Sequence, residues 1–138
     1  MNRKIATALG TAAIAASLSV STLASPAMAG GLIAFYLSPR TAQDAQAMDF
    51  GLRGYSLYNG LRNGANIRQF GRNNSAGIGQ NGNGNLGIVR QEGRDHSATL
   101  QQNGNGNSYG IFQFGSNTDT EVVQSGNGQS GAALLFGW

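Results

Sequence analysis

Residues 85–106 read NLGIVRQEGRDHSATLQQNGNG, and this stretch decides the fold. In each of its two halves, every second residue runs polar, small, aliphatic and glutamine: Asn85, Gly87, Val89 and Gln91, then His96, Ala98, Leu100 and Gln102. A side-chain step of two residues is the period of a β-strand. Short segments with Gly and Asn, which tolerate positive φ, separate the halves and end the stretch. The stretch therefore predicts a strand, a tight corner, a second strand and a second corner.

The same pattern recurs along the chain with a period of 22 residues. Gln69, Gln91 and Gln113 are separated by 91−69 = 22 and 113−91 = 22 residues, and each is followed two places later by glycine. The period defines repeats at 63–84, 85–106 and 107–128, and a partial copy at 129–138. A fixed strand-turn-strand period is typical of a solenoid. We therefore expect an all-β repeat fold, a short β-solenoid of about three and a half rungs that stack about 4.8 Å apart.

Stacking in register places chemically alike side chains above one another. Amide side chains both donate and accept hydrogen bonds, so files of Gln and Asn can satisfy one another where a single buried amide would be costly. The predicted stacking ladder consists of Asn63, Gln69, Asn74, Gln80, Asn85, Gln91, Gln102, Asn107, Gln113 and Gln124. The predicted aliphatic core column consists of Ile67, Ile78, Val89, Leu100, Ile111 and Val122. The predicted corner glycines are Gly71, Gly93 and Gly115.

The composition leaves few other sources of stability. The chain has 138 residues, no cysteine and 22 glycines. Disulfides are therefore excluded, and the glycines raise the conformational entropy that is lost on folding. Aliphatic residues are scarce in the middle of the chain, so a conventional apolar core is not expected. The chain must either stay disordered or order through a repetitive backbone scheme.

The first 29 residues have the pattern of a signal peptide. A basic start, Met1–Lys4, precedes the apolar stretch Ile5–Leu23, and Pro26–Ala29 ends in a small-x-small pattern. We expect cleavage after Ala29; an uncleaved membrane anchor is the alternative, but the apolar stretch is rich in Ser and Thr and barely long enough to span. Cleavage lowers the formal net charge from 9−6 = +3 to 7−6 = +1. The remaining arginines are scattered, so nucleic-acid binding is not expected.

Residues 30–62 form an N-terminal segment outside the repeats. The segment begins with the apolar run Leu32–Leu37, and Ser38 and Pro39 then have the pattern of a helix N-cap and first turn. We expect a helix that runs as far as Tyr58, although two glycines weaken it. A partial repeat that ends at residues 58–60 is the competing interpretation. In either form the segment is expected to cap the first rung, because solenoid ends need cover.

Several short motifs resemble chemical sites, but their spacing argues against each. Asp95, His96 and Ser97 have the composition of a catalytic triad, yet neighbours in a strand point to opposite faces. His96 stands in the ladder register and is expected to be a polar stacking residue. The Asn-Gly-Asn-Gly turns lack the aspartates and the nonapeptide period of calcium-binding β-roll repeats. They also lack the lysine and the following helix of a phosphate-binding loop. We therefore expect no enzyme activity, metal or cofactor.

The charged residues of the repeats fall at corners or at outward positions. At such places charges are solvated and slow premature aggregation. Arg90 is expected to pair with Glu121 or with a nearer neighbour. The set consists of Arg68, Arg72, Arg90, Glu92, Arg94, Asp95, Asp119 and Glu121.

The outward face of the first strand of each repeat carries a second apolar set. This predicted contact face consists of Phe70, Ile88, Phe112, Phe114, Phe136 and Trp138. A sheet that is partly apolar on both faces indicates a contact surface. The occupant of this surface is the N-terminal segment, another filament or a membrane, and we favour cover by Leu32–Leu37 or by the expected helix.

The repeat is similar to the curlin repeat of bacterial curli fibres. That repeat has Asn or Ser, five residues, Gln, any residue, Gly, two residues, Asn, any residue, Ala, three residues and Gln. The second unit departs from it at His96, and the third at Thr118 and Thr120. The first unit matches all six positions, with Asn63, Gln69, Gly71, Asn74, Ala76 and Gln80. The resemblance covers about residues 63–138, in fewer units than subunits of the family usually carry.

The resemblance implies a structural role outside the cell. A curlin-like subunit passes through the periplasm, meets export and assembly factors of the outer membrane, and polymerises with itself and other curlin-like subunits. The product is an amyloid fibre, a pilus or fimbrium, that serves cell adhesion and biofilm matrix. Templated addition at an exposed end rung is the expected mechanism. The alternative is a surface β-solenoid that does not polymerise and binds a partner or a membrane through its aromatic face. A major and a minor, nucleating subunit are both compatible with the sequence.

Overall fold

The computed structural model describes residues 18–21, 30–61 and 64–138. The predicted signal peptide, residues 1–29, lies outside the described residues except for one short strand. The elements in chain order are β1 (Leu18–Ser21), β2 (Leu32–Leu37), α2 (Ala42–Tyr58), β3 (Gly64–Arg72), β4 (Ser75–Asn81), β5 (Leu86–Arg94), β6 (Ser97–Asn103), β7 (Ser108–Ser116), β8 (Asp119–Ser125) and β9 (Ser130–Gly137). Within the described part of the chain, no helix is long and apolar enough to cross a membrane.

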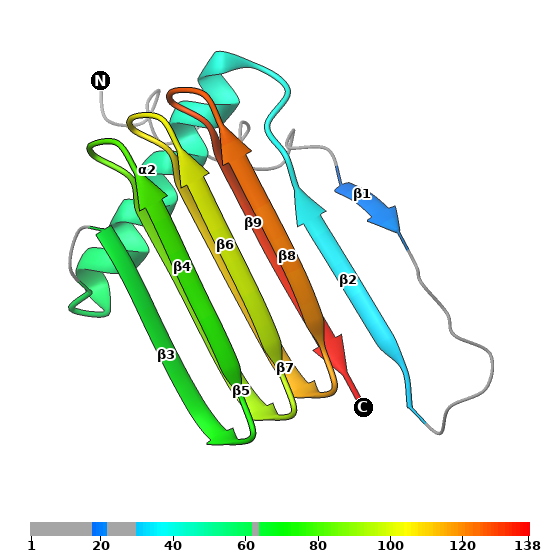
Figure 1. Cartoon of the computed structure of the whole chain (residues 1–138). Coiled ribbons are helices and arrows are strands. Elements are labelled where there is room, and N and C mark those ends of the chain that lie inside the picture. Colours follow the sequence, from blue (N-terminus) through cyan, green and yellow to red (C-terminus); the bar gives the residue numbers. More distant parts are fainter. Residues whose placement is uncertain (1–17, 22–29, 62–63) are drawn as a thin grey trace.

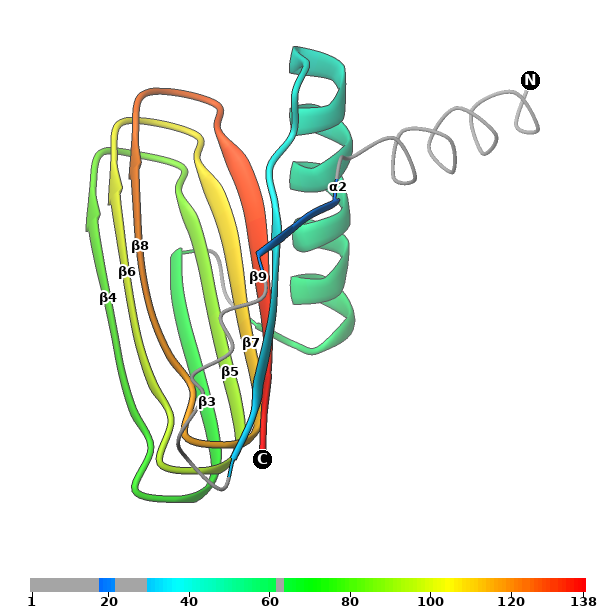
Figure 2. The ribbon, with the colours of Figure 1, turned by 90° about the vertical axis from the view of Figure 1, so that its right-hand side faces the viewer.

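The repeats form the predicted β-solenoid. The six-stranded sheet has the order β1-β2-β9-β7-β5-β3, and the three-stranded sheet has the order β4-β6-β8. Within the repeats all neighbouring strands are parallel and one period apart, so that Gln69 pairs with Gln91 and Gln91 with Gln113. Figure 1 shows the stacked strands of the repeats, and Figure 2 shows the two layers that they form. We call β3 with β4 the first rung, β5 with β6 the second, β7 with β8 the third, and β9 alone the half rung.

Tight corners close each rung from one sheet to the other. Asn73, Asp95 and Asn117 have positive φ values of 56°, 58° and 54° at the three equivalent corners. Asn and Asp adopt this left-handed backbone more readily than other residues with a side chain. The corners are also bonded to one another, because the Asp95 N–H donates to the Arg72 carbonyl (3.2 Å) and the Asn117 N–H to the Arg94 carbonyl (3.1 Å). The corners therefore hold the same register as the strands.

A thin apolar column fills the space between the two sheets. Val89, Leu100 and Ile111 are at most 1% exposed, and Leu135 continues the buried cluster in the half rung. Complete burial of a side chain of this size stabilises a fold by about 1.5–3 kcal/mol. Ile67 belongs to the same column in the first rung but is 42% exposed, because no strand of the described residues stacks on the open side of β3. The prediction that Ile67 is a core residue is therefore wrong for this end of the stack.

A second apolar cluster lies between α2 and the outer face of the six-stranded sheet. Leu52 of α2 packs against Leu86 and Ile88 of β5, with Met48 and Tyr55 beside it. Figure 2 shows α2 lying on the outer side of this sheet. The expected helix is thus present, and the partial-repeat interpretation of residues 58–60 is wrong.

The start of α2 differs from the expectation. The N-cap is Thr41, whose Oγ1 accepts a hydrogen bond from the Asp44 N–H (3.1 Å), so Ser38 is not the cap. A threonine N-cap with an acidic residue in the first turn satisfies free N–H groups and favours the helix dipole. Two long-range bonds anchor the helix: Ser130 Oγ donates to the Ala45 carbonyl (2.6 Å), and Arg53 donates to the Gly84 carbonyl (3.0 Å).

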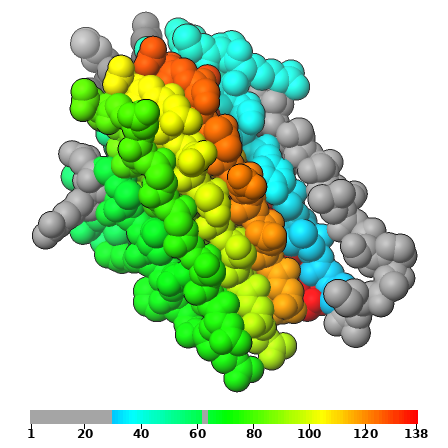
Figure 3. All heavy atoms as spheres, viewed as in Figure 1, coloured from blue at the N-terminus to red at the C-terminus, as the bar shows by residue number. Residues whose placement is uncertain are grey.

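The N-terminal segment caps the opposite end of the stack from the one expected. β2 pairs antiparallel with β9, from Leu32 opposite Gly137 to Leu37 opposite Ala132. The prediction that this segment caps the first rung is therefore wrong. Figure 3 shows β2 in cyan alongside the orange strand of the third rung, and the Tyr36 hydroxyl lies 3.4 Å from Thr120 Oγ1 of β8.

The buried Tyr109 makes the fold sensitive to alkali. Burial raises the pKa of Tyr109 from 10.0 to about 12, with a smaller contribution from Tyr36. Between these two values the unfolded chain releases the phenolic proton while the folded chain keeps it, so stability falls as the pH rises, by about 1.4 kcal/mol per pH unit. We expect the urea midpoint of wild type to drop between about pH 10 and about pH 12, and that of Tyr109→Phe to drop less. Equal drops in the two proteins would contradict this assignment.

Candidate stacking interface

Two files of glutamine run through the interior of the stack. In the six-stranded sheet, Gln69 Nε2 donates to Gln91 Oε1 (2.8 Å), and Gln91 Nε2 donates to Gln113 Oε1 (2.7 Å). In the three-stranded sheet, the bonds from Gln80 to Gln102 and from Gln102 to Gln124 measure 2.7 and 2.9 Å. Every bond runs from the lower to the higher rung. The files therefore have a direction, with acceptors facing the first rung.

The second proton of each interior amide crosses to the opposite sheet. Gln91 Nε2 also donates to the Ser75 carbonyl (2.8 Å), and Gln102 Nε2 to the Leu86 carbonyl (3.0 Å). Gln113 and Gln124 make the equivalent bonds to the Ser97 and Ser108 carbonyls. Leaving a buried donor unsatisfied costs about 1–3 kcal/mol. The files are tolerated in the interior because these bonds satisfy both protons of Gln91 and Gln102, which are 0% exposed.

The asparagine file is built differently from the glutamine files. Asn85 Oδ1 accepts from the Asn107 backbone N–H (3.0 Å), and Asn107 Oδ1 accepts from the Gln129 N–H (3.0 Å). Asn85 Nδ2 donates to the Gly104 carbonyl (2.9 Å). The expected amide-to-amide ladder of asparagines is therefore replaced by bonds to backbone. Asn74 follows the same scheme with the His96 N–H and the Gly93 carbonyl, and Asn63 lies outside the described residues.

His96 takes the asparagine position in the second rung. Its side chain is 1% exposed, with Nδ1 2.7 Å from Thr118 Oγ1 and Nε2 3.2 Å from the Glu92 carbonyl. Asp95 is exposed at the corner, where its Oδ1 accepts from Asn73 Nδ2 (3.2 Å). Ser97 is exposed as well. His96 is thus bonded along the stack, and the contacts of Asp95 and His96 do not assemble a triad.

The predicted contact face divides into two environments. Ile88 is 2% exposed beneath α2, and the Phe112 ring meets the Tyr55 ring edge-on at 5.4 Å. Phe114 stacks on Phe136 at 5.3 Å. Phe70 and Trp138, which are 52% and 63% exposed, lie at the two ends of the stack. The face is therefore covered by α2 over Ile88 and Phe112, and its most exposed rings among the described residues lie toward its ends.

Arg90 finds its partners on its own face of the sheet. Its guanidinium donates hydrogen bonds to Glu92 and to the Tyr55 hydroxyl (3.2 Å). Of the two expected partners, Arg90 therefore pairs with the nearer neighbour, Glu92, and not with Glu121. The hydrogen bonds to Tyr55 and Glu92 raise the pKa of Arg90 above its usual value. The guanidinium also lies 5.8 Å from the centre of the Phe70 ring.

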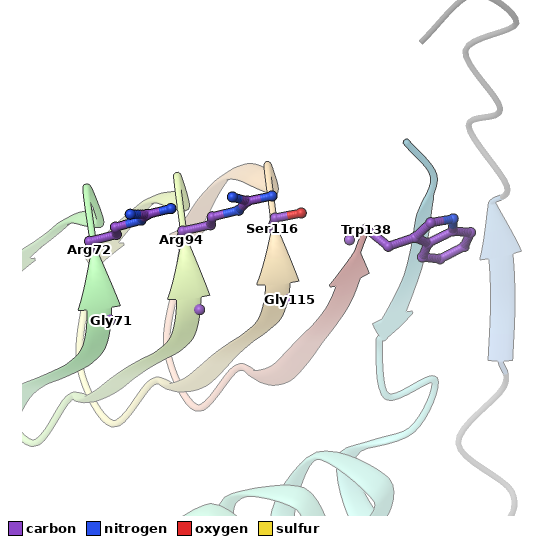
Figure 4. Close-up of a pocket in the computed structure, with 8 residues that line it drawn as sticks. Gly71, Arg72, Arg94, Gly115, Ser116 and Trp138 are labelled. Carbon is purple, nitrogen blue, oxygen red and sulfur yellow. The ribbon is translucent and has the colours of Figure 1, made fainter. Parts of the chain in front are cut away.

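A shallow groove follows the corners along the stack. Its wall is formed by Arg72, Arg94 and Ser116 on successive rungs, and Trp138 stands at its end (Figure 4). Gly137 and the corner glycines Gly71, Gly93 and Gly115 also line the groove. The groove is thus a direct consequence of the repeat.

The two ends of the stack present different surfaces. At the first rung, β3 and β4 have no further strand beside them among the described residues. No donor within the described part of the chain bonds to Oε1 of Gln69 or Gln80. At the other end, β2 covers β9, and Leu135 stands in the register of Gln113. The repeat pattern alone did not predict this closed end. One signal was present, because position 113+22 = 135, where the period would place a glutamine, is a leucine.

Comparison with known proteins supports the repeat. The family model described as curlin associated repeat matches residues 60–93, which span the first rung and most of β5. No curated protein and no solved structure matches the chain significantly. The matched residues include Gln69, Gly71, Asn74 and Gln80, which hold the positions of the repeat in the first rung. The chain therefore contains a match to the curlin associated repeat at residues 60–93.

Proposed function

We propose that this chain is a structural subunit of a curli-like extracellular fibre, exported by its signal peptide and acting in cell adhesion and biofilm matrix. It joins other curlin-repeat chains end to end, through continued pairing of strands and glutamine files. The curlin associated repeat supports this role, and so does the absence of a catalytic arrangement around His96 in the described residues. The fibre is held by backbone ladders and amide files, so no cofactor is needed.

The open first rung is the observation that carries the proposal. Its strands expose unpaired backbone groups, which are a template for another chain. Its apolar residue Ile67 is 42% exposed, although the equivalent Val89 and Ile111 are buried. The acceptors Gln69 Oε1 and Gln80 Oε1 face outward in the positions that a preceding rung would fill. A rung of the same kind would bury the aliphatic side chain and satisfy both acceptors.

The alternative, a partner or membrane bound through the aromatic face, has less support. α2 already covers Ile88 and Phe112 on that face, and Phe114 and Phe136 partly cover one another by ring stacking. On that face Phe136 is still 38% exposed, and the more exposed rings, Phe70 and Trp138, lie at opposite ends of the stack. They do not form one continuous patch.

Binding to fibre ends tests the proposal. The chain has no cysteine, so Leu57→Cys on the outward side of α2, where Leu57 is 80% exposed, gives a single label site. We expect labelled residues 30–138 to sediment with preformed fibres of a major curlin subunit and to appear at fibre ends by microscopy. The double variant Gln69→Leu/Gln80→Leu loses two acceptors, each worth about 1 kcal/mol. Its Kd for fibre ends should therefore rise by roughly tenfold or more.

The matched control is Gln101→Leu, because Gln101 is an exposed, outward glutamine on β6. This variant should bind as wild type does, and all variants should keep the far-ultraviolet circular dichroism of a β protein. Absence of binding, or binding spread along the fibre sides, would contradict the proposed function.

A further inference from the structure

The strand count shows that the two ends of the stack do not fit one another. Among the described residues, the repeats contribute β3, β5, β7 and β9 to one sheet and β4, β6 and β8 to the other. The first end begins with a complete rung, and the last end stops after half of one. If β3 of a second copy were placed on β9, its β4 would lie one strand spacing, about 4.8 Å, too far from β8. If its β4 were placed on β8, its β3 would occupy the position of β9.

β2 closes the half rung that the repeats leave open. Ala34 is 4% exposed and belongs to the interior cluster, with Leu32 and Tyr36 packed against the same cluster. The Tyr36 hydroxyl reaches Thr120 on β8, above which the three-stranded sheet has no further strand among the described residues. Two backbone bonds between Gly31 and Trp138, at 2.8 and 3.0 Å, fasten the end of this strand. β2 therefore covers the position where the next rung would begin.

The glutamine file of the six-stranded sheet also ends before this surface. Leu135 is 0% exposed in the register of Gln113, and Gln113 Nε2 donates instead to the Ser97 and Thr118 carbonyls (2.7 and 3.2 Å). Its two protons are thus used within the chain. β2, with the sequence LIAFYL, brings no amide side chain to replace them. On its other side β2 pairs antiparallel with β1, which lies within the predicted signal peptide. In residues 30–138 a further rung would therefore meet a strand that runs opposite to the repeat strands, and no donor from this file.

We infer that this chain is a one-ended subunit that terminates a fibre. Its first rung docks on the last rung of another curlin-repeat chain, whose glutamines offer Nε2 donors to Gln69 Oε1 and Gln80 Oε1, and β2 then blocks the next addition. The direction of the files sets this orientation, because two first rungs brought face to face would oppose acceptor to acceptor. The inference rests on the proposed function and specifies the partner surface and the consequence of binding.

Seeded growth of a curli fibre tests the inference. Short seeds and monomer of a major curlin subunit are mixed with residues 30–138, and elongation is followed by thioflavin fluorescence. At about ten times its Kd for fibre ends, the chain occupies about nine ends in ten, so growth at those ends should slow roughly tenfold. Gln69→Leu/Gln80→Leu should restore growth, and Gln101→Leu should slow it as wild type does.

Two substitutions in β2 test whether this strand covers the edge of β9. Ala34→Asp places a charge in the interior and should release β2, exposing the edge of β9. Ile33→Asp changes the neighbouring residue, which is 37% exposed on the other side of the strand. We expect light scattering to show concentration-dependent association for Ala34→Asp, and monomers for wild type and Ile33→Asp. Release of β2 bares the β9 edge in addition to the first rung, so that each copy offers a second pairing surface, whereas β2 covers β9 in the other two proteins.

The possible failures separate the inference from the proposed function. Three results would overturn the inference and leave the fibre-subunit role standing. They are labelled chain inside the fibre body, continued fibre growth when the chain saturates the fibre ends, and fibres formed by the wild-type chain alone. A head-to-head dimer of wild type would overturn the inference as well. Failure to bind any fibre end would remove the proposed function itself.

Discussion

Replacing Gln91 with lysine is expected to lower the free energy of unfolding by about 3–5 kcal/mol, the cost of an uncompensated charge in a protein interior. Gln91 is 0% exposed, accepts from Gln69 and donates to Gln113 and to the Ser75 carbonyl. The buried polar residues among those described include no Asp or Glu. An ammonium group at this position would have no counter-charge, and the Gln69 amide would direct a donor at it.

The matched control for this substitution is Gln101→Lys. Gln101 lies on β6 beside Gln102 but is exposed, so its replacement places the charge in water. Urea unfolding followed by circular dichroism should show a large loss in midpoint for Gln91→Lys and little change for Gln101→Lys. Equal midpoints would mean that the glutamine file contributes nothing to the fold.

Gln91→Leu separates the effect of charge from the effect of the file. Leucine removes the ladder bonds without adding a charge, so the loss should be smaller, about 1–3 kcal/mol for the unsatisfied neighbours. The chain itself contains this residue at Leu135, where the file ends. There Gln113 finds two backbone carbonyls instead, and no amide points at the leucine without a partner. At position 91 the Nε2 group of Gln69 points at the substituted side chain, and it would lose its acceptor if that side chain were leucine.

The solenoid could be predicted because a covalent period fixes its contacts. Once rungs stack in register, the neighbour of any residue is the one 22 positions away, as for Gln91 and Gln113. The files of glutamine followed from that step alone. Asparagine obeyed the same register but not the same bonding, because its side chain is one methylene shorter and bonds backbone groups at the corners.

The ends and the N-terminal segment could not be predicted in this way. A period assigns every rung the same surroundings, so it predicts the burial of Val89 for Ile67 as well. Within the described part of the chain, however, the first rung has a neighbouring rung on one side only. β2 and α2 lie outside the period, and their positions depend on long-range packing against β9 and β5. The apolar run Leu32–Leu37 predicts burial but not which strand it joins.

Replacing Gly93 with alanine is expected to be as damaging as a charge in the interior, although the change adds one methyl group. Gly93 has a φ of +130°, and a Cβ there would lie 1.9 Å from the Gly115 carbonyl oxygen and 2.9 Å from His96 Nε2. The carbonyl belongs to the backbone of the next rung and cannot move without separating β5 from β7. We expect a loss of about 4 kcal/mol or more, at the far end of what single substitutions cause.

Gly106→Ala is the control that isolates the close approach. Gly106 also has a positive φ, +66°, but a Cβ at that position meets nothing within 4 Å. Its replacement should cost only the roughly 1–2 kcal/mol of left-handed backbone at a residue with a side chain. A urea midpoint for Gly93→Ala well below that of Gly106→Ala would show that the spacing of the rungs at the corner, and not the turn conformation alone, requires glycine. Equal midpoints would show that the rungs can separate at this corner without loss, and the tight stacking on which the files depend would then be wrong.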